Sequence, residues 1–254
     1  MSTTLTLARK EMSEYARTWR IWVVSAAFLF FALTSPVIAR IAPDLIGSMA
    51  EGQSGAVIVQ LPPPTWRDSY LQWIKNLSQI GMLVLVVVGS GLVAGERSSG
   101  TAAIVLAKPV SRRVFVAVKA MTLSAVVMAT AAVGSALVHV GTQLVFGDSP
   151  GVPLWSATVV WVLSAWVVIA MTTLLSSWLP TMAAAGCGIG AYLLLSALTI
   201  SSAISEHSFA GLISAPAALV VGESPSLGWP VASGLLAVAL LIASATSVFS
   251  RRDL

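Results

Sequence analysis

The sequence predicts an all-α integral membrane protein with six transmembrane helices, and three observations point to this class. Of its 254 residues, 57% are hydrophobic and only 9% are charged, whereas soluble domains carry roughly 25% charged residues. Six apolar runs also approach or exceed the ~20 residues that a helix needs to cross a bilayer. They fall at about 21–39, 77–94, 114–138, 154–175, 182–204 and 229–249. No linker rich in Pro, Gly or Ser separates them, so residues 1–254 are predicted to form a single transmembrane domain.

The segment before the first run has the pattern of an amphipathic helix. Charged and polar residues fill one face of residues 4–20, and apolar residues recur at helical spacing on the other: Leu5, Ala8, Met12, Tyr15, Ala16 and Trp19. Such a helix is expected to lie flat on the membrane, in contact with lipid headgroups. A cleaved signal peptide fits less well, because the following apolar run is long and no small-x-small cleavage site follows it.

The first and second runs are joined by the long segment 43–76. Three consecutive prolines, 62–64, interrupt it. Trp66, Tyr70 and Trp73 then follow at roughly helical spacing. Aromatic side chains of this kind are typical of the membrane interface, so the three are expected to form an interface belt ahead of the second span.

The second and third runs are separated by the most informative stretch, the polar and basic residues 96–119. Its apolar part, 102–106, is too short to cross a bilayer. Ser98, Ser99 and Gly100 precede this part, and Pro109 follows it, in the manner of helix start and stop signals. The pattern predicts a short helix over 98–107 that meets water and partners, with Ser111 capping the next helix.

The remaining runs follow in short succession. The third admits an extension to Phe146, and Pro180 indicates a hairpin between the fourth and fifth. Residues 209–221 are apolar but too short to cross, which favours a re-entrant or interfacial helix, with an ordinary loop as the alternative. Gly186 and Gly190, four residues apart in the fifth run, are expected to allow close packing of helices.

The distribution of Lys and Arg predicts the orientation, because cytoplasmic segments of membrane proteins are enriched in both. Three of the fourteen basic residues, Arg40, Arg67 and Lys75, fall on one side of the predicted topology, and eleven fall on the other. Both termini and the 96–113 loop are therefore predicted to be cytoplasmic. An even number of spans independently places the two termini on one side.

The sequence offers little support for catalysis. His139 and His207 are its only histidines and are expected to face outward, which leaves too few convergent ligands for a metal site. Neither Gly-x-Ser-x-Gly nor a phosphate-binding Gly-x-x-x-x-Gly-Lys-Ser/Thr pattern occurs. The single cysteine, Cys187, excludes an internal disulfide. We predict no catalytic, cofactor or metal residues, no nucleic-acid partner, and a subunit that another protein drives.

Several motifs resemble those of the permeases of type-2 ATP-binding-cassette (ABC) exporters. The similarity lies in Glu96-x-x-x-Gly100-Thr101, Leu106-x-x-Pro109-x-Ser111-Arg112 and Lys119, together with the leader Arg9-Lys10-Glu11 and the terminal Ser250-Arg251-Arg252. The six spans and the missing nucleotide site agree with it over essentially the whole chain. Two departures are local: Val105-Leu106-Ala107 stands where the family has a leucine pair, and the 43–76 loop is longer than in the simplest members.

The resemblance implies a permease in a bacterial-type plasma (inner) membrane that works as a homodimer or a heterodimer with a paralogue. Two separate cytoplasmic ATPase subunits would bind Mg·ATP and dock on the coupling helix at 98–107, and residues 4–18 would form a connecting helix beside that coupling helix. Glu96 would pair with Arg97, Arg112 or Arg113. The residues expected to dock or couple the ATPase are Glu96, Arg97, Gly100, Thr101, Leu106, Pro109, Ser111, Arg112 and Lys119.

Two alternatives and one open question remain. A membrane protein that works without an ATPase partner would be either an intramembrane enzyme, which would have to use His139 or His207, or a structural or assembly factor. The cargo is not specified by the sequence. Spans that offer Ser, Thr and aromatic side chains rather than charges favour an amphipathic, lipid-like or hydrophobic molecule.

Overall fold

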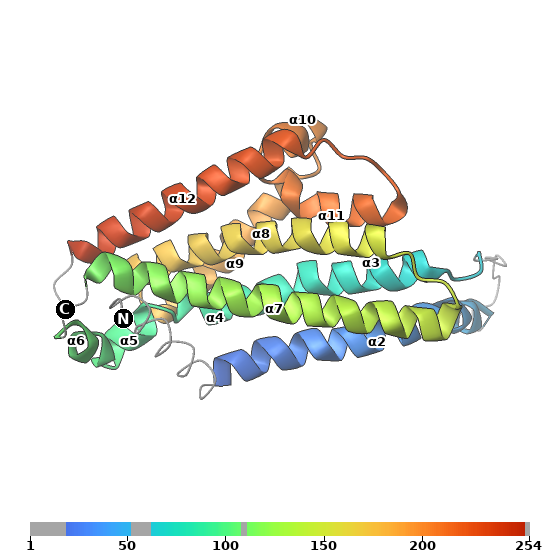
Figure 1. Cartoon of the computed structure of the whole chain (residues 1–254), viewed down its shortest axis with the longest axis horizontal. Coiled ribbons are helices and arrows are strands. Elements are labelled where there is room, and N and C mark those ends of the chain that lie inside the picture. The colour runs from blue at the N-terminus through green and yellow to red at the C-terminus, as the bar shows by residue number, and fades with distance from the viewer. Residues whose placement is uncertain (1–18, 52–61, 108–110, 252–254) are drawn as a thin grey trace.

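The structure, a computed structural model, describes residues 19–51, 62–107 and 111–251, and all regular structure in those ranges is helical. The predicted helix at 4–18 lies outside them. Figure 1 shows long helices running side by side. In order they are α2 (Trp19–Glu51), α3 (Trp66–Asn76), the π-helix η1 (Leu77–Gly81), α4 (Met82–Ser90), α5 (Ala94–Ser98), α6 (Thr101–Leu106), α7 (Arg112–Phe146), α8 (Gly151–Trp178), α9 (Thr181–Leu198), α10 (Ser202–His207), α11 (Gly211–Val221) and α12 (Gly228–Ser250).

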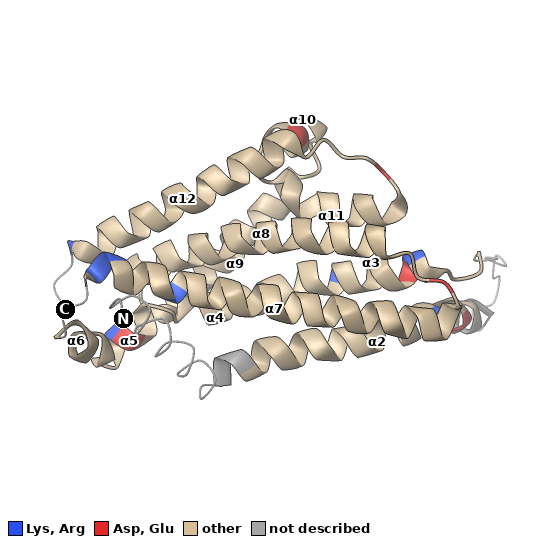
Figure 2. Ribbon diagram, viewed as in Figure 1, with Lys and Arg blue, Asp and Glu red and all other residues tan. Residues whose placement is uncertain are grey.

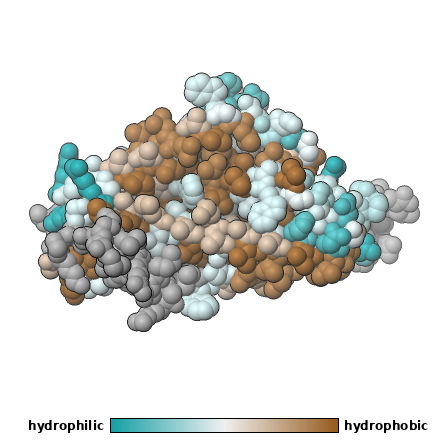
Figure 3. Space-filling view, in the orientation of Figure 1, coloured by the Kyte–Doolittle hydropathy of each residue, from teal (hydrophilic) through white to brown (hydrophobic). Residues whose placement is uncertain are grey.

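Six of the described segments are long and apolar enough to cross a membrane, which confirms the predicted class. They are Trp22–Gly47, Trp66–Ser98, Arg112–Phe146, Gly151–Trp178, Thr181–Leu198 and Gly228–Ser250. A broad apolar belt covers the middle of the molecule in Figure 3. Charged residues gather at its two ends in Figure 2. One end carries α5, α6, the start of α7 and the end of α12 (Figure 1); we call it the α5–α6 end.

Three spans differ in extent from the prediction. The first continues through Pro36 and Pro43 to Glu51, so Pro43 does not begin the loop, because membrane helices tolerate proline. The third does reach Phe146. The fifth ends at Leu198 rather than near 204.

The second span begins much earlier than predicted. A capping box between Thr65 and Asp68 starts α3 at Trp66, and the helix runs on through η1 into α4. The expected interface belt is consequently wrong for Tyr70 and Trp73, which are fully buried. Trp73 donates a hydrogen bond to Ser135 at 3.1 Å and meets the ring of Phe28 edge-on, 6.5 Å away.

The predicted hairpin and short outer helix both occur. Pro180 precedes α9 directly, so α8 and α9 form a hairpin. Residues 211–221 form α11, which lies along α8 rather than across the end of the bundle (Figure 1). The segment is therefore a helix rather than an ordinary loop.

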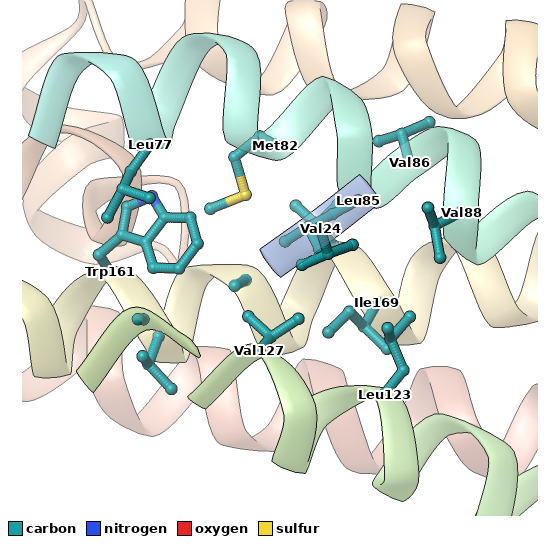
Figure 4. Close-up of a cluster of buried hydrophobic side chains, with 14 of the residues drawn as sticks. Val24, Leu77, Met82, Leu85, Val86, Val88, Leu123, Val127, Trp161 and Ile169 are labelled. Atoms are coloured by element: carbon teal, nitrogen blue, oxygen red, sulfur yellow. The ribbon is translucent and has the colours of Figure 1, made fainter. Parts of the chain in front are cut away.

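The core forms around α8, which packs against α4, α7, α9, α11 and α12. Figure 4 shows part of it, where α2, α4, α7 and α8 contribute Val24, Leu85, Val127, Ile169 and Trp161. The Trp161 ring meets Phe28 edge-on at 5.6 Å. These contacts among large buried side chains join α2, α4, α7 and α8 in one core.

Close helix packing uses other glycines than those predicted. Gly186 and Gly190 have no other atoms within 4 Å of an added Cβ, so neither packs against another helix of this chain. Gly188 instead faces Val86, and Gly134 faces Trp73. Four-residue spacing does not reveal which face of a helix turns inward.

Replacing Gly134 by alanine is expected to destabilise the fold by about 1–3 kcal/mol through overpacking. The added Cβ would lie 2.6 Å from Trp73, and that ring is held by Ser135 and Phe28. The free energy of unfolding in detergent measures the effect. Gly186→Ala is the control, because its Cβ would enter open space; equal effects of the two substitutions would contradict the prediction.

Candidate functional site

The second span breaks where it reaches the α5–α6 end. α4 ends at Ser90, residues 91–93 form a turn, and α5 starts at Ala94. The hydroxyl of Ser176, on α8, fills the break. It accepts hydrogen bonds from the amides of Val93 (3.0 Å) and Ala94 (2.9 Å) and donates one to the carbonyl of Ser90 (2.7 Å). One hydroxyl thus satisfies three backbone groups that the break would otherwise leave buried and unpaired.

Arg97 provides a second attachment of α5 to the same helix. Its guanidinium donates to the carbonyls of Ser177 (3.3 Å) and Leu179 (3.0 Å). The last carbonyls of a helix have no partner within it and carry partial negative charge, so a cation is favourable there. Arg97 therefore holds α5 to the turn between α8 and α9.

A buried ion pair joins α5 to α7. Lys119 donates to the carboxylate of Glu96, and the two residues are 2% and 7% exposed. The Lys119 ammonium also lies 5.1 Å from the ring centre of Phe115. That ring stacks on Phe249 of α12 at 5.6 Å. Lys119 is a partner of Glu96 that the sequence did not suggest, since the expected partners were Arg97, Arg112 and Arg113.

α6 presents one face to the bundle and the other outward. Gly100 takes a left-handed conformation (φ 74°) immediately before it, which glycine adopts without steric cost. Ala102 and Val105 are buried, whereas Ile104 is 70% exposed. Leu106 is half-buried and packs against the core of its own chain.

The other predicted residues lie close by in the chain. Thr101 begins α6, and its hydroxyl is 2.5 Å from that of Ser99. Ser111 caps α7 by accepting from the amide of Val114 at 3.3 Å, as predicted, and Arg112 is the first residue of that helix. Pro109 lies outside the described residues. The short helix predicted at 98–107 is α6, and a further short helix, α5, precedes it.

Among the described residues, the two histidines form no cluster like the one at the α5–α6 end. His139 is 3.3 Å from the hydroxyl of Tyr70, and His207 bonds the carbonyl of Ala203. Across the described ranges, no three His, Cys, Asp or Glu side chains are grouped as a metal ion would require.

The far end of the bundle contains a cavity of about 770 Å³. α10, α11 and the loop that follows α11 form most of its wall, with Leu71 of α3. The lining mixes hydroxyl groups, two carboxylates and apolar side chains: Leu71, Thr199, Ile200, Ser202, Ser205, Glu206, Gly211, Ser214, Ala215, Ala217, Ala218, Val221, Glu223, Ser224, Pro225 and Ser226.

Sequence reasoning missed two residues of the α5–α6 end. Ser176 looked like part of a short polar link, and no local signal connects it to residue 93. Ile104 could have been found from helical spacing alone, because it is two residues from both Ala102 and Leu106 and so projects from a different side of α6.

Comparison with known proteins gives two matches. A family model described as "ABC-2 family transporter protein" matches residues 5–209. The "Uncharacterized transmembrane protein YxlG" of Bacillus subtilis (strain 168) is 23% identical over 199 residues, which cover 75% of this chain and 74% of that protein.

Proposed function

We propose that ATPase subunits drive this chain by docking on α5 and α6. The premise is that the chain belongs to the ABC-2 family of transporter proteins and is therefore a multi-pass permease subunit of an ABC transporter. In this proposal two separate ATPase subunits bind Mg·ATP and seat against these helices from the cytoplasm. The permease exports its cargo and has no catalytic group of its own. Its membrane domain comprises the whole chain, 1–254.

The observation that carries the proposal is the exposure of Ile104, the large apolar side chain on the outward face of a short helix whose other face is buried. An exposed isoleucine at the water-facing end of a membrane bundle is unfavourable unless a partner covers it. The helix around it is firmly held, because Ala102 and Val105 are buried and α5 is bonded to α7 and α8. A rigidly held apolar contact is suited to receive a push from a moving partner.

The charge distribution supports placing this end in the cytoplasm of a bacterial-type plasma (inner) membrane. Arg97, Arg112, Arg113 and Arg251 lie in or beside α5, α7 and α12 at the α5–α6 end (Figure 2). Arg40, Arg67 and Lys75 lie in α2 and α3 toward the other end. An excess of Lys and Arg marks the cytoplasmic side, so both chain termini are assigned to the cytoplasm.

A second permease copy completes the proposed complex, as a homodimer or with a paralogue. Only 33% of the first span, 17% of the fifth and 11% of the sixth is buried in their most apolar windows. On α9 the exposed Gly186 and Gly190 leave room for a close helix neighbour. The translocation pathway would lie between the two copies, and an amphipathic or hydrophobic cargo suits its uncharged walls.

Replacing Gly100 by valine is expected to reduce coupling to the ATPase while leaving the bundle folded. A β-branched residue at φ 74° costs about 1–2 kcal/mol, and the strain falls on the junction between α5 and α6. The measurement compares the ATP hydrolysis rate of the ATPase with and without the reconstituted permease. The change that the permease causes in this rate should be severalfold smaller with Gly100→Val than with the wild type.

Gly147→Val is the matched control. Gly147 has the same φ of 74°, has open space around it, and caps the opposite end of α7. Gly147→Val should impose the same backbone strain, while the hydrolysis rate of the complex stays as in the wild type. Equal effects at the two glycines would show that strain alone, rather than the docking junction, determines the result.

The test of the function is purification of the tagged chain in gentle detergent, followed by identification of what accompanies it. A stoichiometric partner with a Gly-x-x-x-x-Gly-Lys-Ser/Thr loop supports the proposal. Recovery of the chain alone, under conditions that keep known ABC complexes intact, would reject the docking role and favour a protein that works without an ATPase.

A further inference from the structure

The hydroxyl of Ser176 differs from its neighbours on α8 in what it bonds. Thr172, Thr173 and Ser177 each donate to a carbonyl of their own helix, three or four residues back. Ser176 instead makes three hydrogen bonds to the break between α4 and α5. A serine hydroxyl has one proton and two lone pairs, so these bonds use its whole capacity.

The break between α4 and α5 decides how a force on α5 reaches the rest of the chain. Residues 91–93 interrupt the helix, and Val93 has a φ of −106°. Tighter bonds from the amides of Gly91 and Leu92 to the carbonyls of Val88 and Gly89 replace regular α-helical bonding there, so α5 is joined to α4 less stiffly than along an uninterrupted α-helix. The bonds of Ser176 and Arg97 tie α5 to the end of α8 instead.

The end of α8, to which α5 is bonded, is followed in the chain by the fifth span, α9. Arg97 bonds the carbonyl of Leu179, and Pro180 and α9 follow immediately. α9 contacts the rest of the chain mainly through α4 and α8 and is mostly exposed. Few of its residues are buried, so α9 is less enclosed than α7 or α8, and its N-terminal attachment point lies beside α5.

We propose that Ser176 and Arg97 form a clamp that passes movement of the docking helices through the turn between α8 and α9 to α9. The inference rests on the proposed function, because it assumes that an ATPase moves α5 and α6. It goes beyond it by assigning the fifth span as the element that responds and Ser176 as the positioning residue. Neither residue touches cargo or nucleotide in this role.

Hydrogen exchange tests the clamp in the purified full-length chain. Ser176→Ala removes the acceptor of the Val93 and Ala94 amides, and their exchange is expected to accelerate roughly tenfold or more. Ser164→Ala is the control, because Ser164 is also buried on α8 but bonds its own helix at Trp161. Unchanged exchange at 93 and 94 in Ser176→Ala would overturn the structural basis of the inference.

Cys187 offers a reporter for transmission. It is the only cysteine of the chain, lies on α9 and is exposed. An environment-sensitive fluorophore on Cys187 is followed in the reconstituted permease–ATPase complex as Mg·ATP with vanadate is added. The wild type and Ser164→Ala should respond, and Ser176→Ala should lose most of the response while keeping its ATPase partner.

The outcomes separate the inference from the function on which it rests. A bound, hydrolysing ATPase together with the same Cys187 response in Ser176→Ala and wild type would overturn the clamp alone, as would a wild type whose label does not respond. Failure of the wild type to retain any ATPase would remove both proposals. Should Ser176→Ala fail to fold, Arg97→Met carries the same test, with loss of the response expected.

Discussion

Replacement of Lys119 by methionine is expected to lower the free energy of unfolding by about 3–5 kcal/mol, because it removes one partner of a buried ion pair. Methionine keeps the length and volume of the side chain but leaves the Glu96 carboxylate, 7% exposed, without its ammonium. Reversible unfolding in mixed detergent micelles measures the loss. The same variant should release α5 from α7 and so weaken the response of the complex to ATP.

The double variant Glu96→Gln/Lys119→Met separates the interaction from the two side chains. Removing both charges avoids an uncompensated buried ion, so the double variant should recover much of the stability that Lys119→Met loses. Lys75→Met, at an exposed lysine of α3, should change stability by no more than about 0.5 kcal/mol. An additive double variant, or an effect at Lys119 no larger than at Lys75, would argue against the pair as a structural lock.

Replacement of Ile104 by aspartate is expected to reduce the ATPase recovered with the permease at least tenfold. In the proposed complex the ATPase covers Ile104, and burying an unpaired carboxylate there costs several kcal/mol, while ~1.4 kcal/mol suffices for a tenfold loss of affinity. Because Ile104 is 70% exposed in the free chain, the bundle itself should keep its stability. Quantitative co-purification from the same membranes measures the loss.

Two further variants sharpen this result. Ile200→Asp introduces the same change at an 89% exposed isoleucine beyond α9, at the other end of the molecule, and should leave ATPase recovery unchanged. Leu106→Asp should lower both stability and recovery, since Leu106 packs against the core of its own chain. Full recovery of the ATPase with Ile104→Asp would exclude α6 as the docking surface.

The sequence alone determined the features that depend only on residues close together along the chain. Hydrophobic length gave the six spans, because crossing a bilayer requires a minimum run of apolar residues whatever packs beside it. Capping by Ser111 and the hairpin at Pro180 likewise follow from the conformations open to each residue type. The family resemblance also rested on such local motifs, and the family match confirms it.

Only the tertiary structure decided which faces meet. The pairs that build the α5–α6 end join residues distant in sequence: 23 positions separate Glu96 from Lys119, and 86 separate Ser90 from Ser176. Gly188 rather than Gly186 turns inward, Trp73 is buried rather than interfacial, and Ile104 rather than Leu106 projects outward. In lipid, apolarity does not distinguish a helix face that meets a neighbour from one that meets acyl chains, so close packing and hydrogen bonding between helices make that choice.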